Sequence, residues 1–406
     1  MLPNSLLAPY YHHGDIEFIN DDIGWICNIS GEIWKTTDAG DNWTRVANQP
    51  TTSFRSITFA DEMNGWVGNL GPGSWVGSTQ DTIPLYETND GGLTWTVVTN
   101  ISGPMPDGIC GIQAIGNTIH AAGRFAGDAY FISSTDGGAS WVSQDLNLDY
   151  DAFVDVLFFT PDEGYITGSG GGGNAVLLHT TDGGANWTTV STNNAYHYWK
   201  AGFASPTFGY AVRWSGVDAD KWIQTYDGGT TWTDRVFVGN YEANGITFLD
   251  EQAGFISGHE AHTLRTVNGG DSWESFQVDN VYGDYINKFL RMSDELVYGI
   301  GMRVYRYTAD SCAPAPNPPH AFDNSVSALS ASSSGGVTTF KYTVPEDDNV
   351  EITIYLRGGP IYDRPIDKRQ VAGSYSFTYT PYDNTPVLYA ALVTGDYRQR
   401  VRFDNQ

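Results

Sequence analysis

A short acidic octapeptide recurs six times along this 406-residue chain and limits the folds open to it. The copies are TTDAGDNW at 36–43, TNDGGLTW at 88–95, STDGGASW at 134–141, TTDGGANW at 180–187, TYDGGTTW at 225–232 and TVNGGDSW at 266–273. Their third residues, at steps of 52, 46, 46, 45 and 41 positions, are Asp38, Asp90, Asp136, Asp182, Asp227 and Asn268. A period of about 40 to 50 residues is typical of β-propellers and other arrays of one repeated unit.

A second pattern with the same period indicates what each unit contains. An apolar strand, an acidic turn and a strand opening with Gly-aromatic precede most octapeptides, as in IEFINDDIGWIC and ITFADEMNGWVG. The copy GIQAIGNTIHAAG (111–123) lacks the aromatic, and a seventh copy, KFLRMSDELVYGIG (288–301), precedes a segment without the glycines and tryptophan. With the two strands beside the octapeptide, each unit has four strands, and seven units predict an all-β, seven-bladed propeller over residues 1–311. We expect the N-terminal segment around Leu6 to Tyr11 to complete the seventh blade.

The chemistry of the octapeptide suits a turn. An Asp or Asn side chain accepts hydrogen bonds from turn amides, glycine supplies a positive φ, and tryptophan packs between neighbouring units. Catalytic aspartates would have to converge on one pocket, whereas these lie on separate hairpins. We therefore assign the five aspartates and Asn268 a structural role.

The pattern S/T-x-D-x-G-x-x-W is similar to the Asp-box, or BNR, motif. This resemblance implies that each copy forms the hairpin between the third and fourth strands of a blade. In spacing and strand texture, residues 12 to 311 resemble the seven-bladed group related to the photosystem II stability and assembly factor. Sialidases, sortilin-type receptors and xyloglucanases share the motif with other blade layouts.

A ligand site is expected on the face opposite these hairpins. There, the loops that lead into the first strands gather around the axis with the loops between second and third strands. The candidate ligand-binding residues are Tyr11, Trp75, Asp151, Tyr198, Trp199, Trp214, Glu260 and Tyr285. Aromatic rings with carboxylates form a platform for a glycan or a protein. The alternative, that these aromatics only cover the blade ends, stays open.

Several partner classes are disfavoured by composition. The net charge, 21 − 47 = −26, repels phosphate backbones, and no apolar stretch of about 18 residues exists to span a membrane. HEAH at 259–262 is not H-E-x-x-H, and GSGGGGNA at 168–175 lacks a strand–helix context, so neither a metal nor a cofactor is expected. The cysteines Cys27, Cys110 and Cys312 have no metal-site spacing, which favours buried thiols.

A second domain follows the propeller. The Pro-rich segment 312–321 reads as a linker, and alternating strands over 322–406 predict a β-sandwich. Its layout resembles the immunoglobulin-like domain of flagellar hook-cap proteins and the C-terminal sorting domains of type IX secretion substrates in Bacteroidetes-like bacteria. Docking through this sandwich is the expected role.

Three functions stay open at this point. The first is a non-catalytic binding scaffold, extracellular or particle-associated, although no secretory signal is visible in this sequence. The second is a glycoside hydrolase acting through carboxylates on the same face, which requires two of them at a defined separation. The third is a structural component of a phage tail or contractile injection particle.

Overall fold

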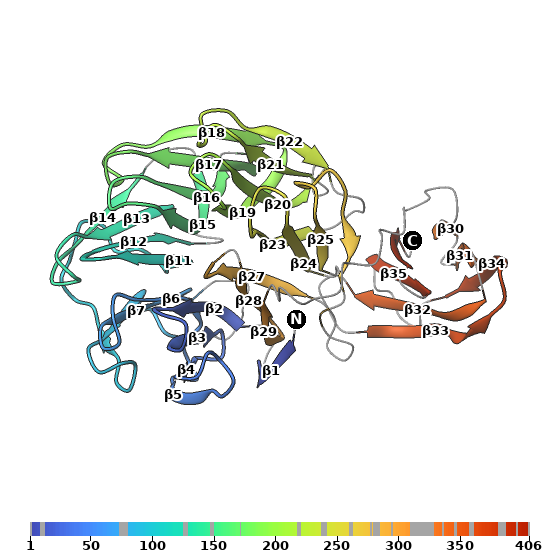
Figure 1. Cartoon of the computed structure of the whole chain (residues 1–406), viewed down its shortest axis with the longest axis horizontal. Helices are drawn as coiled ribbons and strands as arrows, with labels where there is room; N and C mark the ends of the chain where they lie inside the picture. The colour runs from blue at the N-terminus through green and yellow to red at the C-terminus, as the bar shows by residue number, and fades with distance from the viewer. Residues whose placement is uncertain are drawn as a thin grey trace. The chain divides into compact units, whose positions relative to one another are not determined.

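The computed structural model (Figure 1) describes residues 2–8, 13–72, 80–124, 129–146, 150–170, 172–216, 221–236, 242–259, 263–276, 278, 285–293, 295–308, 329–334, 337–344, 347–356, 361–380, 387–394 and 397–404. Every regular element in this part of the chain is a β-strand, which confirms the all-β prediction. The chain forms two compact units. The first contains Met1–Phe237 and Tyr241–Ser311, and the second contains Cys312–Gln406.

The first unit is a seven-bladed propeller with one sheet for each sequence repeat. Blade 1 contains β2 (His13–Phe18), β3 (Gly24–Asn28), β4 (Glu32–Thr36) and β5 (Thr44–Asn48). Blade 2 contains β6 (Phe54–Phe59), β7 (Gly65–Asn69), β8 (Leu85–Thr88) and β9 (Thr96–Val97). Blade 3 contains β11 (Gly111–Ile115), β12 (Thr118–Gly123), β13 (Tyr130–Ser134) and β14 (Trp141–Asp145), and the short β10 (Ile101–Ser102) runs parallel to β14 at its outer edge.

The remaining blades repeat the four-strand plan. Blade 4 contains β15 (Tyr150–Phe158), β16 (Gly164–Gly170), β17 (Asn174–Thr180) and β18 (Thr188–Asn193). Blade 5 contains β19 (Ala195–Phe203), β20 (Gly209–Gly216), β21 (Lys221–Thr225) and β22 (Thr233–Val236). Blade 6 contains β23 (Glu242–Phe248), β24 (Gly254–His259), β25 (Leu264–Thr266) and β26 (Glu274–Ser275), and blade 7 contains β27 (Ile286–Arg291), β28 (Leu296–Gly301) and β29 (Arg303–Thr308).

The blades form a closed ring around an axis lined by their first strands. In cyclic order, contacts join β2 to β6, β6 to β11, β11 to β15, β15 to β19, β19 to β23, β23 to β27 and β27 back to β2. Figure 1 shows these strands around the middle of the ring. The ring is closed by β1 (Leu2–Leu7), which pairs antiparallel with β29 and becomes the outer strand of blade 7. The closing strand begins before the predicted Leu6–Tyr11 segment and shares Leu6 and Leu7 with it; residues 9–11 of that segment are outside the described part.

Each octapeptide forms the hairpin between the third and fourth strands of its blade. In blade 4, Thr180 Oγ1 donates to Asp182 Oδ1 (2.9 Å), the Asn186 amide donates to the same oxygen (2.8 Å), and the Gly184 amide donates to Thr180 Oγ1 (3.0 Å). The same three bonds recur in the other five copies, including the one built on Asn268. These are the contacts of a turn-forming motif.

Size complementarity between the first and second strands explains the glycine before each aromatic. Gly164 lies opposite Phe158, and a Cβ on that glycine would lie 2.4 Å from the phenyl ring. Equivalent Gly–Phe pairs occur in blades 1, 2, 5 and 6. In blade 3 the sizes are exchanged, because Ile119 lies opposite Ala114. His120 then takes the place of the aromatic residue and stacks on Phe158 at 3.6 Å.

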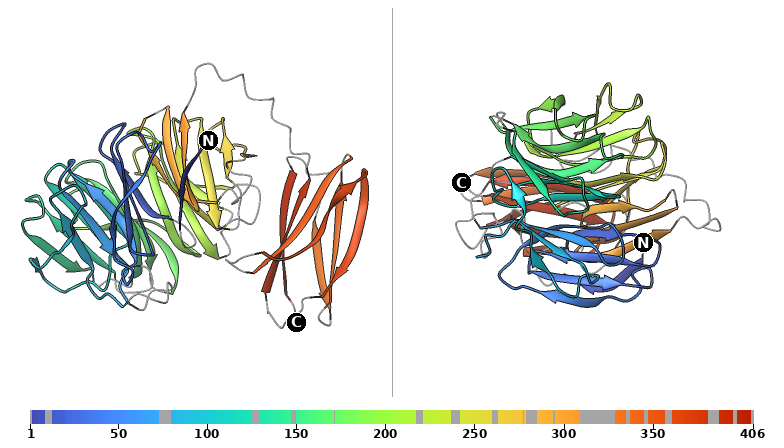
Figure 2. Two further views of the ribbon diagram at one scale, coloured as in Figure 1. Left: turned by 90° about the horizontal axis from the view of Figure 1, so that it is seen from below. Right: turned by 90° about the vertical axis from the view of Figure 1, so that its left-hand side faces the viewer.

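The second unit is a sandwich of two sheets (Figure 2). One sheet has the order β30 (Ser330–Ser334), β31 (Val337–Val344) and β34 (Gly373–Tyr379). The other has the order β33 (Ile361–Gln370), β32 (Asp348–Leu356), β35 (Val387–Thr394) and β36 (Tyr397–Asp404). Phe340 and Val344 of the first sheet pack with Ile352 and Leu392 of the second in one buried core.

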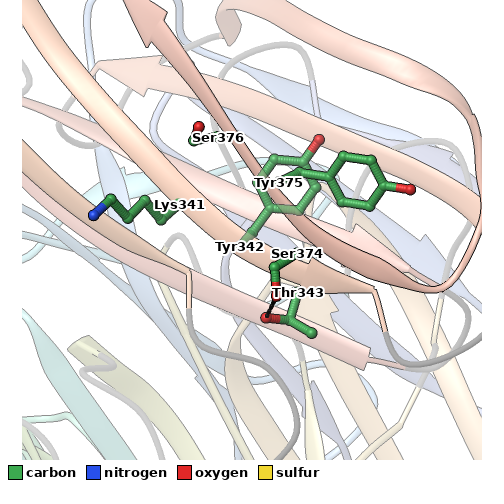
Figure 3. A pocket seen from close by; sticks show the side chains of 6 residues that line it. All are labelled: Lys341, Tyr342, Thr343, Ser374, Tyr375 and Ser376. Carbon is green, nitrogen blue, oxygen red and sulfur yellow. Dashed lines mark hydrogen bonds between the residues drawn. The ribbon is translucent and has the colours of Figure 1, made fainter.

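A shallow depression lies over β31 and β34 and is lined by Lys341, Tyr342, Thr343, Ser374, Tyr375 and Ser376 (Figure 3). Tyr342 is only 3% exposed, and its ring stacks on that of Tyr375 with 5.5 Å between centroids. The two ring faces therefore pack on each other and do not form an open platform. The docking role expected of this domain stays a prediction.

Candidate functional site

The first strands of blades 1, 2, 4, 5, 6 and 7 share an irregularity near their start. Their register with the second strand shifts by one residue, which is the mark of a β-bulge. The residues in the bulges are Gly14, Arg55, Val154, Trp199, Asn244 and Asn287, and those that follow them are Asp15, Ser56, Asp155, Lys200, Gly245 and Lys288. Bulges redirect side chains. In four of these strands a charged residue directly follows the bulged residue.

A contact between two of the bulged residues, Arg55 and Trp199, shows that the bulges lie close to the axis of the ring. The guanidinium carbon of Arg55 in blade 2 lies 5.9 Å from the ring centroid of Trp199 in blade 5. These blades are not neighbours, because blades 3 and 4 separate them on one side and blades 6, 7 and 1 on the other. The contact therefore crosses the middle of the ring. Arg55 also donates a hydrogen bond to the Gly14 carbonyl of blade 1 (2.6 Å).

Two ion pairs join neighbouring blades at the same level. Lys200 Nζ lies 2.8 Å from Asp155 Oδ2, between blades 5 and 4. Lys288 of blade 7 pairs with Asp15 of blade 1, whose carboxylate also accepts the Ile57 amide of blade 2 (3.0 Å). The Lys288 side chain is 18% exposed and that of Asp155 is 15% exposed, so solvent reaches these pairs.

Burial changes the protonation of this cluster. Burial lowers the pKa of Lys200 to about 8; Asp155 opposes this shift, while Lys288 and Arg55 add to it. Burial raises the pKa of Glu17, two residues after Asp15, to about 8 against the effect of Lys288. For Lys288, burial disfavours the charge, but Asp15 and Asp155 outweigh it and raise the pKa. At pH 7, Glu17 is therefore protonated and both lysines are charged.

An aromatic rim lies beside the cross-axis contact. Trp199 is 8% exposed, and its ring centroid lies 5.5 Å from that of Trp214 and 6.2 Å from that of His197. Burial lowers the pKa of His197 to about 4, so its ring is neutral at pH 7. Tyr285, one residue before β27, is partly exposed; burial raises its hydroxyl pKa and the charge of Arg55 opposes this rise. Arg55 and Tyr285 are therefore within electrostatic range of each other. We call Arg55, His197, Trp199, Trp214 and Tyr285 the axial mouth.

The structure places four of the eight candidate ligand-binding residues. Trp199, Trp214 and Tyr285 lie in the axial mouth. Tyr198 is fully buried, and its hydroxyl contacts Asn193 Nδ2 and Ser191 Oγ at 2.7 Å, a packing role within and between blades 4 and 5. Tyr11, Trp75 and Glu260 lie outside the described residues, as does the side chain of Asp151, whose backbone belongs to β15.

The sequence pattern did not assign three of the axial charges, those of Asp15, Asp155 and Lys288. Asp15, Asp155 and Lys288 sit inside apolar first strands, in IEF, DVLFF and KFL contexts where an apolar residue is the norm. Charged residues inside these strands were the available signal. Across the described side chains, no group of three or more His, Cys, Asp or Glu residues is arranged to hold a metal ion. Within the same part of the chain, no helix is long and apolar enough to cross a membrane.

Comparisons with known proteins agree with this fold. A family described as photosynthesis system II assembly factor YCF48 matches residues 115–197. The chloroplast photosystem II stability/assembly factor HCF136 of Arabidopsis thaliana is 22% identical over 274 residues, which cover 63% of this chain and 64% of that protein. The chain thus spans less than two thirds of the length of this relative.

Two solved structures show the same architecture. YCF48 bound to D1 peptide has a TM-score of 0.58 and 16% identity, covering 75% of this chain and 96% of that one. The GH74 enzyme of Niastella koreensis has a TM-score of 0.56 and 14% identity, covering 97% of this chain and 66% of that one. At these identities the likeness shows the fold alone.

Proposed function

We propose that this chain is a non-catalytic binding scaffold whose axial mouth receives a protein ligand. The observation that carries the proposal is the Arg55–Trp199 contact across the axis; Trp214 packs near Trp199, and Tyr285 is within electrostatic range of Arg55. Arg, Trp and Tyr are the residues most enriched among energetically dominant positions of protein interfaces. One solved propeller of this architecture is bound to a peptide, which supports a protein over a glycan as the ligand class.

The hydrolase alternative requires two carboxyl groups that are free to act on a sugar. The two axial aspartates of the described part, Asp15 and Asp155, are each paired with a lysine. Glu17 is protonated at neutral pH but lies beside the Asp15–Lys288 pair. These pairings favour a binding role. The extracellular or particle-associated location and the particle-component role stay predictions.

The proposal is tested with peptides selected from a random displayed library on the full chain. Their affinity is then measured by biolayer interferometry for the wild type, Trp214→Ala and Trp95→Ala. Trp95 is the matched control, because it is also a partly buried propeller tryptophan but belongs to an Asp-box hairpin on the other face. We expect Trp214→Ala to weaken binding about thirtyfold, the loss typical of an interface hot spot, and Trp95→Ala to leave it nearly unchanged.

The reverse ranking would place the site on the hairpin face and contradict the proposal. A glycan array and a hydrolysis assay run on the same preparations decide the alternatives. Sugar turnover abolished by Glu17→Gln would replace the scaffold with a hydrolase.

A further inference from the structure

We infer that the axial mouth is an anion site that takes a carboxylate of the bound protein ligand. This inference rests on the proposed function and names the chemistry that the ligand has to present. It is carried by the position of Arg55. Its side chain is buried, with 4% exposure for the residue, and yet no carboxylate of the described residues lies within ion-pair distance of it. Its described partners are the Gly14 carbonyl and the Trp199 ring.

A buried guanidinium without a counter-charge is unfavourable, because burial removes its hydration and a ring face replaces little of it. A carboxylate bound at the mouth supplies that counter-charge. The planar guanidinium presents paired N–H donors whose spacing matches the two oxygens of a carboxylate. Tyr285 lies within electrostatic range of the same guanidinium.

The charges below the mouth favour the same ligand. With Glu17 protonated, the described axial side chains carry three cations, Arg55, Lys200 and Lys288, and two carboxylates, Asp15 and Asp155. Among these described side chains cations outnumber carboxylates by one, whereas the whole chain carries −26. An acidic surface repels polyanions such as nucleic acids, but a single carboxylate at the axis meets the local surplus.

The proposal predicts selective binding of small carboxylates. Succinate is titrated into the full chain by isothermal calorimetry at constant ionic strength, with succinamide as its uncharged analogue and inorganic phosphate as a second anion. We expect succinate to bind, succinamide not to bind, and Arg55→Gln to weaken succinate binding about tenfold or more. Arg45→Gln is the matched control: Arg45 is exposed, pairs with Glu32 in blade 1, and is expected to have no effect.

The pH dependence of succinate affinity tests the inference even if Arg55→Gln folds poorly. Succinate affinity is expected to fall as the pH rises through about 8, because Glu17 and Lys200 both lose their protons there. The charged groups that face this pair are Asp15, Asp155, Lys288 and Arg55. In Glu17→Gln only the Lys200 proton is lost, so the fall is expected to be shallower.

Four results overturn the inference: equal binding of succinate and succinamide, binding of phosphate but not of succinate, unchanged succinate affinity in Arg55→Gln, and identical pH profiles for wild type and Glu17→Gln.

The selected peptides show whether only the anion site fails or the proposed function fails as well. Peptides that need Trp214 but keep their affinity after amidation of every carboxyl group would leave the scaffold in place and remove only the anion site. Amidating the C-terminus alone, or the acidic side chains alone, shows which carboxylate enters.

Discussion

At the scale of single residues, one hydroxyl organises each Asp-box hairpin. Thr180 is 2% exposed; its Oγ1 accepts the Gly184 amide and donates to Asp182, which in turn accepts the Asn186 amide. In two other copies a threonine occupies the position of Asn186. Side-chain hydrogen bonds from these residues, Thr94 and Thr231, lower the pKa of Asp90 and Asp227 to about 2. The carboxylates are thus acceptors fixed by the turn, and Asn268 does the same work because its Oδ1 is also an acceptor.

Thr180→Val is expected to lower the free energy of unfolding by about 2 kcal/mol, because the isosteric valine leaves the buried Gly184 amide without its acceptor. Thr180→Ser is the control, since Ser134 accepts the same bond in blade 3 (2.9 Å). Its loss should be limited to about 0.8 kcal/mol for the buried methyl group. Urea unfolding of both variants gives the comparison, and equal losses would show that the hydroxyl bonds contribute nothing.

At the scale of elements, the ring depends on its closing strand. Two neighbouring side chains of β1 differ in burial: Leu6 is 8% exposed and packs with Ile16, Tyr298 and Val304, whereas Leu7 is 41% exposed. Leu6 therefore joins residues of blades 1 and 7 in one cluster. Blades 1 and 7 are also linked near the axis by the hydrogen bond from Asn287 Nδ2 to the His13 carbonyl (3.1 Å).

Leu6→Ala should lower the free energy of unfolding of the propeller by about 3 kcal/mol, the usual cost of a cavity at a buried leucine. Leu7→Ala, one position along the same strand, should change it by less than about 0.5 kcal/mol. Chemical denaturation followed by tryptophan fluorescence reports the difference. If both variants matched the wild type, β1 would not be holding the ring closed.

At the scale of the whole molecule, the seven blades surround titratable side chains that are largely buried near the axis. Burial of Glu17 makes the stability of the folded chain depend on pH. The pKa of Glu17 is about 8 in the folded chain and about 4.5 when unfolded, so the folded state holds its proton more tightly. The stability that this gives is fully present below pH 4.5 and is lost as the pH rises to about 8.

Replacing Glu17 with Gln removes this dependence. Between pH 4.5 and 8, the wild type should lose about 4 kcal/mol relative to Glu17→Gln, at 1.36 kcal/mol for each pH unit. Unfolding free energies measured at intervals across this range give the test. Parallel profiles for the two proteins would mean that Glu17 titrates normally and is solvated.

The fold was predictable from the sequence because its signals are local. Turn chemistry at a regular period identifies six hairpins, and the seventh copy of the strand pattern, at 288–301, adds the last blade. The exception in blade 3 is also local. There the small residue, Ala114, is on the first strand and the large one, Ile119, is on the second, and His120 replaces the aromatic residue. A pattern search for Gly-aromatic misses that exchange.

The axial mouth was predictable only in part, because it depends on contacts between distant blades. No spacing along the chain indicates that Arg55 meets Trp199 across the ring. The bulge adds a second difficulty: of the adjacent Tyr198 and Trp199, both expected at the site, one packs in the interior and the other lines the mouth. A one-residue shift in register exchanges such roles, and it is not visible in the sequence.

The way β1 closes the ring also sets the timing of assembly. Leu2 pairs with Arg306, which follows it by 304 positions (306 − 2). At a synthesis rate of about 5 to 20 residues per second, the first strand waits roughly 15 to 60 s for its partner. During that interval β1 has no partner strand in its own chain, so a second nascent chain can exchange first strands with it and give a swapped dimer. The length of chain between the two strands, and not the strength of the closed pair, sets how long that exchange stays possible.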